Sequence, residues 1–454
     1  MAGQRDLLAV SVLLAILIPS IVFLGFPTSL INRVLLDEKP HRLRPMSFEG
    51  HQLWTLDIQD KSRAEKLWEI SEELLLDVWT PLRPGSVDIR VSPEQSVALS
   101  DELAILDIPY SITHKDLQLL IDSDEGTASS GQHVIGVETV NFFENYHTLD
   151  EIQTYLDMLV KEYPDLVSHI KLDGKSYEKR DITGIKISLK SGDDAKDKDK
   201  PAFVFHGGIH AREWISPATV LYMATQLITQ SAKDKSVKSV LEKLEFHIFP
   251  VLNVDGFVYT HTSNRMWRKN RQPNPGSMCP GTDPNRNWAF EWGTGGSSKN
   301  PCSEAYMGPS AFSAPEPLAM ADYVKDRSPN VIGYIDFHAF SQLFMYPYGS
   351  DCDATPKDKK KLQAGGDAAA KAIKATHGTS YAVGSICNII YQASGSSTDY
   401  MYAMGNVTYS YAVELRDTGR YGFLLPKTQI IPSGEETFAG LLSLTEYLIK
   451  AEDL

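Results

Sequence analysis

The sequence predicts an α/β fold in which helices cover both faces of a central sheet. Largely apolar runs alternate with segments of helical periodicity from about residue 142 onward. Runs of this kind, without polar alternation, are typical of strands that are buried on both faces. With 454 residues, of which 42% are hydrophobic, the chain is long enough for two or three domains and a large core. The predicted strands cover residues 202–205, 246–252, 331–337 and 409–415.

The N-terminal residues predict entry into the secretory pathway. Arg5 precedes an uncharged, mostly apolar segment over residues 7–26, and a weak small-residue cleavage site lies near Thr28 and Ser29. We interpret residues 1–29 as a cleaved signal peptide, and the chain as secreted. A single-pass signal anchor is the alternative, because about twenty apolar residues also span a bilayer. In both cases the remainder faces an oxidising compartment, where the sequon at Asn406 is a usable glycosylation site.

Residues 30–121 predict a small, separate α/β unit. Residues 52–58 alternate with period two, residues 64–76 have helical spacing, and residues 88–91 are extended. Residues 122–141 follow as a linker, since its first part is rich in Ser, Gly, Asp and Glu and has no apolar periodicity. No lysine or arginine occurs between Lys115 and Lys161, so a protease that cuts after basic residues has no site in this linker.

Residues 142–454 form the predicted main domain, and three sequence patterns predict helix starts within it. A serine or threonine precedes a glutamate by three residues in each case, which is the pattern of a capping box. The three pairs are Thr148 with Glu151, Ser313 with Glu316, and Ser433 with Glu436.

Charge and cysteine content exclude some classes of protein. The net charge is −14, and no basic stripe occurs, which argues against a nucleic-acid partner. Four cysteines are too few for a scaffold built on disulfides, so the hydrophobic core must carry the fold. Their spacing alone leaves the pairing open.

A candidate metal site follows the first predicted strand. His210 and Glu213 lie three residues apart, after a turn that Gly207 and Gly208 allow, and zinc accepts both histidine nitrogen and carboxylate oxygen. Catalytic zinc sites usually need a third protein ligand, and His338 at the end of another predicted strand supplies one. Glu414 ends a further strand and adds an acid, which makes the group a candidate hydrolytic zinc site.

His206 lies four residues before His210 but is not expected to bind the metal. On a path from strand to loop this spacing does not bring two rings together as it would on a helix. The motif His-Glu-x-x-His, typical of zinc endopeptidases, is absent from the sequence.

Five ordered motifs resemble the zinc metallocarboxypeptidases of the pancreatic A/B type. The resemblance runs from about residue 142 to the C-terminus at near-family spacing. The motifs are His210-Ala-Arg-Glu-Trp, Met266-Trp-Arg-Lys-Asn, Asp283-Pro-Asn-Arg-Asn, Tyr391-Gln-Ala-Ser-Gly and Glu414-Leu-Arg-Asp-Thr-Gly-Arg-Tyr-Gly-Phe-Leu-Leu-Pro. The resemblance implies a mixed sheet like that of carboxypeptidase A and one zinc ion per chain, with peptide or protein C-termini as substrates of a monomeric enzyme.

The resemblance also assigns roles to single residues. His210, Glu213 and His338 correspond to the zinc ligands, and Asp283 to the acid that accepts the free ring N–H of the first histidine. Glu414 corresponds to the general base and Arg268 to the residue that stabilises the oxyanion. The residues that correspond to the substrate-binding groups are Arg212, Asn285, Arg286 and Tyr391.

Specificity is predicted from Thr398, which lies where the family places the residue that faces the substrate's last side chain. The residues expected around it are uncharged, which favours apolar or aromatic C-terminal residues because an unpaired buried cation is costly. These residues are Met345, Gly349, Ile386, Ala393 and Ala412. Phe340 stands where the family has a tyrosine, a difference expected to affect substrate binding or rate without removing a ligand.

The resemblance extends to cysteines and to the N-terminal unit. Cys279 and Cys302 lie where the family closes a surface loop, and Cys352 and Cys387 where some members have a second disulfide. Residues 48–52 and 84–91 resemble the pro-segment of procarboxypeptidases, which implies a zymogen and an activating protease that cuts in the linker; a separate binding domain is the alternative reading. A non-catalytic relative would lack a zinc ligand or the base, whereas this chain has the three ligands His210, Glu213 and His338 and the base Glu414.

Overall fold

The structure is a computed structural model that describes residues 45–125, 142–190 and 200–454. The predicted signal or anchor segment lies outside these residues, as does the linker after residue 125. Within the described ranges, no helix has both the length and the apolar character needed to cross a membrane.

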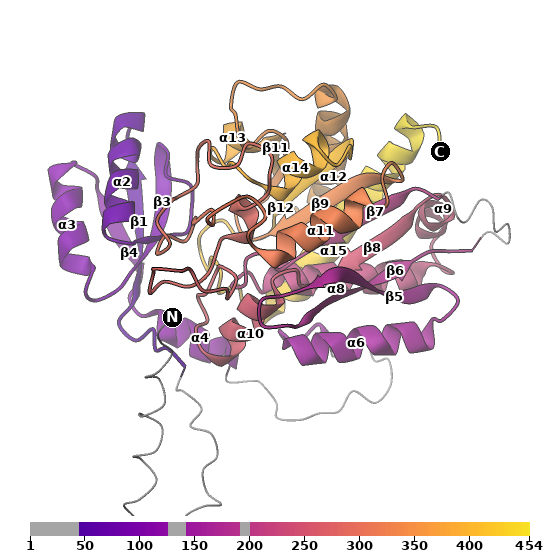
Figure 1. Ribbon diagram of the computed structural model, residues 1–454, viewed down its shortest axis with the longest axis horizontal. Helices are drawn as coiled ribbons and strands as arrows, with labels where there is room; N and C mark the ends of the chain where they lie inside the picture. Colours follow the sequence, from indigo (N-terminus) through magenta and orange to yellow (C-terminus); the bar gives the residue numbers. More distant parts are fainter. Residues whose placement is uncertain (1–44, 126–141, 191–199) are drawn as a thin grey trace, which may run out of the picture. The chain divides into compact units, whose positions relative to one another are not determined.

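Residues 45–125 form an N-terminal module with a four-stranded sheet in the order β2-β3-β1-β4. Figure 1 labels three of these strands, β1, β3 and β4. The strand β1 lies in the middle and pairs antiparallel with both β3 and β4. The elements are β1 (Gln52–Ile58), α2 (Lys61–Glu73), β2 (Asp77–Val78), β3 (Gly85–Val91), α3 (Ser96–Ile105), β4 (Tyr110–His114) and α4 (Leu117–Glu125).

The module has its own core because β1 presents apolar side chains to the helices. Trp54, Leu56 and Ile58 alternate along β1 and are buried with Leu67 of α2. The helix α2 begins where the side chain of Asp60 accepts a hydrogen bond from the backbone N–H of Arg63. Period-two alternation in this segment therefore predicted the strand correctly.

The helix α4 corrects the predicted boundary of the linker. It extends to Glu125, so the first residues of the segment that we predicted as an irregular linker are helical. Leu117 and Ile121 bury one face of this helix in the main hydrophobic core, which explains why a polar sequence continues as a helix.

Residues 142–454 form the main module, an eight-stranded mixed sheet in the order β11-β10-β12-β9-β7-β8-β6-β5. The central strands β12, β9, β7 and β8 are parallel, whereas β10, β6 and β5 introduce antiparallel pairs. The strands are β5 (Val167–Lys175), β6 (Asp181–Ile187), β7 (Ala202–His206), β8 (Glu245–Phe249), β9 (Val331–His338), β10 (Leu343–Tyr346), β11 (Ala382–Ser385) and β12 (Tyr409–Glu414).

The helices of the main module cover both faces of this sheet, as predicted. Neighbouring residues of a strand point to opposite faces. On β12 the Tyr411 hydroxyl donates to the carbonyl of Leu362, and the Ser410 hydroxyl donates to the carbonyl of Thr398 on the opposite face. The helices are α6 (Leu149–Glu162), α8 (Ile215–Gln230), α9 (Lys235–Lys243), α10 (Val254–Thr262), η1 (Pro284–Arg286), α11 (Pro315–Lys325), α12 (Lys359–His377), α13 (Ile386–Ile389), α14 (Ser397–Ala403), η2 (Lys427–Gln429) and α15 (Ile430–Ala451).

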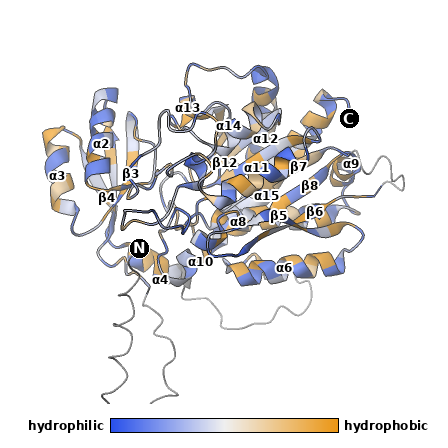
Figure 2. Ribbon diagram, in the orientation of Figure 1, coloured by the Kyte–Doolittle hydropathy of each residue, from blue (hydrophilic) through white to orange (hydrophobic). Residues whose placement is uncertain are grey.

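Burial separates the central strands from the helices around them. Nearly all residues of β7 and β9 are buried, whereas α6 alternates hydrophobic and hydrophilic residues along its length (Figure 2). Ile152, Tyr155, Leu156 and Leu159 form the buried stripe of α6. Two-sided burial explains why apolar runs located the central strands.

One of the three predicted capping boxes is confirmed. Thr148 caps α6, with reciprocal hydrogen bonds between the side chains of Thr148 and Glu151 and the backbone N–H groups. The other two predictions are wrong. The helix α11 begins at Pro315 with Ala314 as its cap, and Ser433 lies inside α15, which begins at Ile430.

Side-chain contacts explain both errors. The Ser433 hydroxyl lies 3.2 Å from that of Thr219 on α8, and Ser313 accepts a hydrogen bond from Asn287. The predicted strand over residues 246–252 also ends early, at Phe249, because Pro250 has no N–H to donate. Tertiary contacts decided the two helix starts, and the proline decided the end of the strand.

Candidate active site

Three parallel strands end at the same edge of the sheet and deliver the predicted ligands and base there. His338 is the last residue of β9 and is paired in register with Glu414, the last residue of β12. After β7 the chain turns through Gly207 and Gly208; a side chain at Gly207 would lie 2.6 Å from the hydroxyl of Ser216. This tight turn places His210 and Glu213 just before α8.

His210, Glu213 and His338 form a buried group that could hold a metal ion. Their ligand atoms all lie within 4.8 Å of one another, and each residue is at most 4% exposed. The Nδ1 atom of His210 is 2.8 Å from Glu213 Oε1, and the Nδ1 atom of His338 is 3.2 Å from Glu213 Oε2.

The polar groups around His210 and His338 are arranged as a cation between the two rings and Glu213 would require. The outer Nε2 atom of each ring lies near a buried carboxylate, which can accept the Nε2 proton when a metal ion takes Nδ1. The two Nδ1 lone pairs, 3.1 Å apart, then face each other and the Glu213 carboxylate. Three acceptors in contact repel one another unless a cation lies between them, and two histidines with one carboxylate are a donor set that zinc prefers.

Asp283 joins the ligand group to Arg268. Its Oδ1 atom lies 3.2 Å from His210 Nε2, and its Oδ2 atom accepts hydrogen bonds from Arg268 Nη2 (3.0 Å) and Nε (3.2 Å). Asp283 also caps the short helix η1 by accepting from the backbone of Asn285. One buried carboxylate thus fixes both a ligand ring and the guanidinium predicted to stabilise the oxyanion.

Glu414 lines the same cavity, and one of its oxygen atoms has no partner. Oε2 is buried and makes no hydrogen bond to the described residues. Burial raises the pKa of Glu414 to about 8 in the metal-free chain, although the charge of His338 opposes the rise. A divalent cation nearby favours the ionised form and lowers this pKa.

The predicted carboxylate-binding residues Arg286 and Tyr391 lie together in the cavity that the ligand group also lines. Arg286 is 5% exposed, and its Nε and Nη1 atoms donate to the carbonyls of Gly296 and Asn285. Its Nη2 atom lies 3.3 Å from the hydroxyl of Tyr391, which is 36% exposed. The guanidinium is therefore held in place while Tyr391 stays at the surface.

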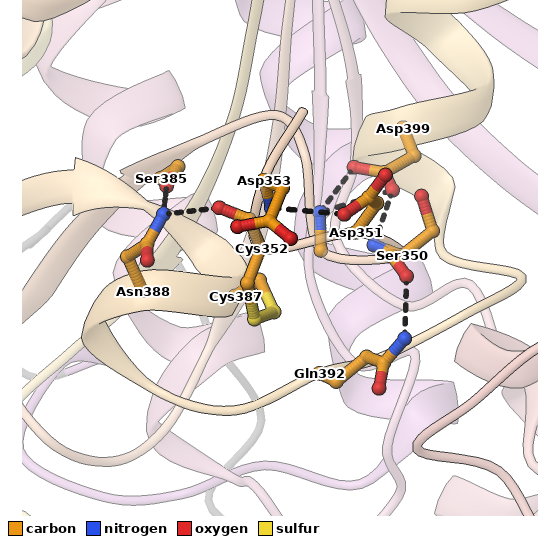
Figure 3. Close-up of a disulfide and its surroundings, with 10 residues drawn as sticks. Ser350, Asp351, Cys352, Asp353, Ser385, Cys387, Asn388, Gln392 and Asp399 are labelled. Atoms are coloured by element: carbon orange, nitrogen blue, oxygen red, sulfur yellow. Dashed lines mark hydrogen bonds between the residues drawn. A yellow bond between two sulfur atoms is a disulfide. The ribbon is translucent and has the colours of Figure 1, made fainter. Parts of the chain in front are cut away.

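Both predicted disulfides are present. Cys279 pairs with Cys302, and Cys352 pairs with Cys387. Figure 3 shows the second disulfide with Asn388, which donates to the carbonyl of Cys352, and Gln392, which donates to the carbonyl of Ser350. These contacts tie the segment that carries Tyr391 to the loop after β10.

Thr398 lies on α14 within an apolar part of the cavity. It is 1% exposed, and five of the residues that line the cavity around it are apolar: Met345, Ile386, Ile390, Ala393 and Ala412. Gly349, predicted in this wall, is not among the lining residues; a side chain there would lie 2.9 Å from Ile386, so it packs behind the wall. Asp399 next to Thr398 accepts from the backbone of Gly349 and Ser350 instead of lining the cavity.

Arg212 contacts the N-terminal module. Its Nη1 atom donates to Asp77 Oδ1 at 2.7 Å, and Asp77 Oδ2 accepts from Arg90 Nε at 2.8 Å. Trp79 packs against Phe423 with ring centroids 5.0 Å apart. Together with the ligand group, Asp77 and Trp79 line a cavity of about 430 Å³, so the N-terminal module covers one side of it.

The remaining predicted residues are also located. His206 is buried outside the ligand group, with Nε2 2.5 Å from the Tyr334 hydroxyl, which agrees with the prediction that it is not a ligand. Phe340 is buried against Phe423, and Asn406 is exposed. Sequence reasoning missed Asp77 as the partner of Arg212, and Asp336, which lies 3.0 Å from His338 Nε2.

Comparison with known families identifies the class. The profile described as zinc carboxypeptidase matches residues 152–440, and that of the carboxypeptidase activation peptide matches residues 54–124. The chain therefore belongs to the zinc carboxypeptidase family and is a metallocarboxypeptidase with an activation peptide, the arrangement of a zymogen. The N-terminal module is this pro-segment, and the family's zinc agrees with the donor set of the ligand group.

Individual relatives agree over most of the chain. It is 39% identical over 406 residues to carboxypeptidase A1 of Sus scrofa and 41% identical over 406 residues to carboxypeptidase A2 of Mus musculus, each covering 88% of this chain and 94% of the relative. The crystal structure of thrombin activatable fibrinolysis inhibitor has a TM-score of 0.79 at 32% identity, covering 89% of this chain and 100% of that chain. Carboxypeptidase A from Helicoverpa armigera also has a TM-score of 0.79, at 27% identity, covering 90% and 99%.

Proposed function

We propose that this metallocarboxypeptidase is secreted and releases single apolar or aromatic residues from peptide C-termini. The observation that carries the proposal is the apolar part of the cavity around Thr398. A lysine or arginine side chain entering it would lose its water without gaining a charged partner, which costs several kcal/mol. An aromatic or large aliphatic side chain would gain about 1.5–3 kcal/mol by burial.

Arg286 is proposed to bind the C-terminal carboxylate of the substrate. A guanidinium forms two parallel hydrogen bonds with a carboxylate, and the carbonyls of Gly296 and Asn285 already fix its orientation. Tyr391 lies within reach of Arg286 Nη2 and adds a hydroxyl, and the side-chain amide of Asn285 lines the same cavity. Recognition of a free carboxylate restricts the enzyme to chain ends.

Cleavage is proposed to use Glu414 and Arg268 on either side of the peptide bond. When bound, zinc supplies a Lewis acid that polarises the carbonyl and makes water a stronger nucleophile near neutral pH. Glu414 accepts the proton of the attacking water and later returns it to the leaving amine. Arg268, held by Asp283, donates to the oxyanion as its charge develops, so the site needs no rearrangement at that moment.

The pro-segment is proposed to block substrate binding through Arg212. The Asp77 carboxylate contacts the guanidinium that would otherwise bind the substrate farther from its C-terminus. Burial alone would raise the pKa of Asp77, but the charges of Arg212 and Arg90 hold it below its usual range. The contact is therefore ionic at neutral pH.

A paired assay tests the proposed activity. Two peptides that differ only in a C-terminal Phe or Lys are incubated with protein whose pro-segment has been removed by limited proteolysis, with and without a zinc chelator. Release of Phe, at least about 100-fold faster than release of Lys and lost on chelation, is the expected result. Equal release of both residues contradicts the apolar preference, and turnover that persists in chelator contradicts the zinc mechanism.

Export and oligomeric state are tested separately. The N-terminal sequence of protein recovered from culture medium is expected to begin after residue 29, which contradicts the signal-anchor alternative. Light scattering of the same sample is expected to give the mass of one chain. Protein retained in the membrane fraction with residues 7–26 intact would instead favour the anchor.

A further inference from the structure

Both ligand histidines have a buried carboxylate behind them. His210 Nε2 lies 3.2 Å from Asp283 Oδ1, and His338 Nε2 lies 3.0 Å from Asp336 Oδ2. The resemblance to known carboxypeptidases assigned a role to Asp283 and none to Asp336. The two pairs have similar N···O separations, although only the first has the N–H···O geometry of a hydrogen bond.

The strand β9 places Asp336 where it can contact the ligand ring. Asp336 precedes His338 by two residues, so both side chains lie on the same face of the sheet. Asp336 is fully buried, and its Oδ2 atom also accepts a hydrogen bond from the Ser397 hydroxyl at 2.5 Å. A buried carboxylate is costly unless donors surround it, and His338 Nε2 and Ser397 Oγ are the donors that contact this oxygen.

Asn285 removes the alternative acceptor for the His338 proton. Its Nδ2 atom lies 3.0 Å from His338 Nε2, and its Oδ1 atom accepts from the backbone N–H of Ser397, which fixes the orientation of the amide. In the metal-free chain the amide therefore presents an N–H group to Nε2. Once a metal ion binds Nδ1, the proton must lie on Nε2, and Asp336 Oδ2 is then the acceptor within reach.

A second histidine lies behind the other oxygen of Asp336. His206 on β7 is the register partner of Asp336, and its Nδ1 atom is 3.5 Å from Asp336 Oδ1. The opposite ring atom, Nε2, is 2.5 Å from the Tyr334 hydroxyl. His206 Nδ1 and Asp336 Oδ1 make no hydrogen bond to any described residue, so His206 packs beside the carboxylate without bonding to it.

We propose that Asp336, which Ser397 holds in place, is a positioning residue for the zinc ligand His338. It accepts the Nε2 proton, holds the ring in the tautomer that directs Nδ1 to the metal, and makes that nitrogen a stronger ligand. The inference rests on the proposed assignment of His338 as a ligand and extends it to the residues behind it.

Zinc affinity of the full chain tests the proposal without measuring turnover. The metal is removed by dialysis against a chelator, and Zn²⁺ is returned in competition with a chromophoric chelator of known affinity. Asp336→Asn is expected to weaken zinc binding by about 10- to 100-fold, as is Asp283→Asn. Wild-type affinity in Asp336→Asn, with weakened binding in Asp283→Asn, overturns the proposal.

Two reference variants separate the possible failures. His338→Ala is expected to abolish specific zinc binding; if it does not, the ligand assignment in the proposed function is wrong. Glu316→Gln changes another fully buried carboxylate, hydrogen-bonded to Asn270, and is expected to leave zinc affinity unchanged. A loss as large in Glu316→Gln as in Asp336→Asn would indicate a general packing effect and overturn the specific role.

A measurement on the wild-type chain covers the case in which Asp336→Asn does not fold. In the zinc-loaded protein with ¹⁵N-labelled histidine, both ligand rings are expected to show a slowly exchanging Nε2 proton shifted downfield by its carboxylate partner. The two protons correspond to His210 with Asp283 and His338 with Asp336. A single such proton would contradict the proposal.

Discussion

The two walls of the cavity differ in how their side chains are held. On the wall with the ligand group, charged side chains pair with buried partners: His210 and Arg268 with Asp283, and His338 with Asp336. On the wall around Thr398, apolar side chains pack against one another. The first wall is therefore organised for chemistry, and the loss of one charged side chain there disturbs several partners. The second wall is organised for selectivity, and a substitution there has a local effect.

The largest expected effect is on the charged wall. Glu414→Gln keeps the shape of the side chain but removes the base, and the expected loss in kcat is about 10²- to 10⁴-fold. Steady-state hydrolysis of a C-terminal-Phe peptide measures it, with zinc content as the control because Gln is not expected to expel the metal. Activity within a few-fold of wild type would mean that another group accepts the proton.

Thr398→Asp tests the apolar wall. A carboxylate there gives a cationic side chain a partner. The backbone carbonyl of Thr398 accepts a hydrogen bond from the Ser410 hydroxyl, and the substitution leaves this carbonyl in place. Hydrolysis of the C-terminal-Lys peptide is expected to rise and that of the Phe peptide to fall, each by about 10- to 100-fold, the equivalent of about 1.4–2.7 kcal/mol. Matched kcat/KM values for both peptides measure the change, and an unchanged ratio would place the specificity elsewhere.

Asp77→Asn tests the contact that joins the charged wall to the pro-segment. Loss of the charge-assisted hydrogen bond to Arg212 is expected to weaken the association by about 1.5–3 kcal/mol, whereas the contact with Arg90 lies within the pro-segment. Faster release of the pro-segment in limited proteolysis measures this, with Asp57→Asn, at an exposed position on β1, as the control.

The same contact predicts a pH dependence. Because the folded-state pKa of Asp77 is depressed, its stabilisation is fully present above the unfolded value of about 3.9 and is lost as pH falls through the lower folded value. The rate of pro-segment cleavage in the wild type is therefore expected to carry no contribution from Asp77 titration between pH 7 and about pH 5. A wild-type rise across that interval that is absent in Asp77→Asn would contradict the assignment.

The smallest expected effect is at Tyr391. Tyr391→Phe removes one hydroxyl that lies 3.3 Å from Arg286 and leaves the ring, so KM is expected to rise about 2- to 10-fold with little change in kcat. Initial rates over a range of peptide concentrations separate the two constants. A large fall in kcat would show that Tyr391 acts in the chemical step and not in binding.

The sequence revealed the strand-end ligands because two-sided burial leaves a clear signal. His210, His338 and Glu414 each follow an apolar run, and a polar residue at the end of such a run stands out. Asp336 gave no comparable signal, because an acid within a predicted buried strand could contact a helix cap, a ligand or another histidine. The register of β7 with β9 decides which of these residues lies beside Asp336, and the sequence does not show that register. The antiparallel strands β5 and β6 were missed because their exposed lysines and aspartates interrupt the pattern.

Contacts between distant segments were the other limit. Asp77 and Arg212 are 135 residues apart, and neither carries a local pattern that predicts the other. Ser433 and Glu436 matched a capping box, yet Glu436 binds Arg416 from within a helix. Local propensity is overridden where a side chain has a stronger tertiary partner.

The strength of the ion pair between Asp77 and Arg212 can be changed without harm to the mature enzyme only by substitution of Asp77. Arg212 is also proposed to bind substrate in the mature enzyme, so a substitution of Arg212 that weakens the ion pair also impairs activity. Asp77 is removed with the pro-segment and has no role in the mature enzyme. Natural substitutions that change the rate of activation are therefore expected on the pro-segment side of this contact. The same side is the practical place for engineered changes in zymogen latency.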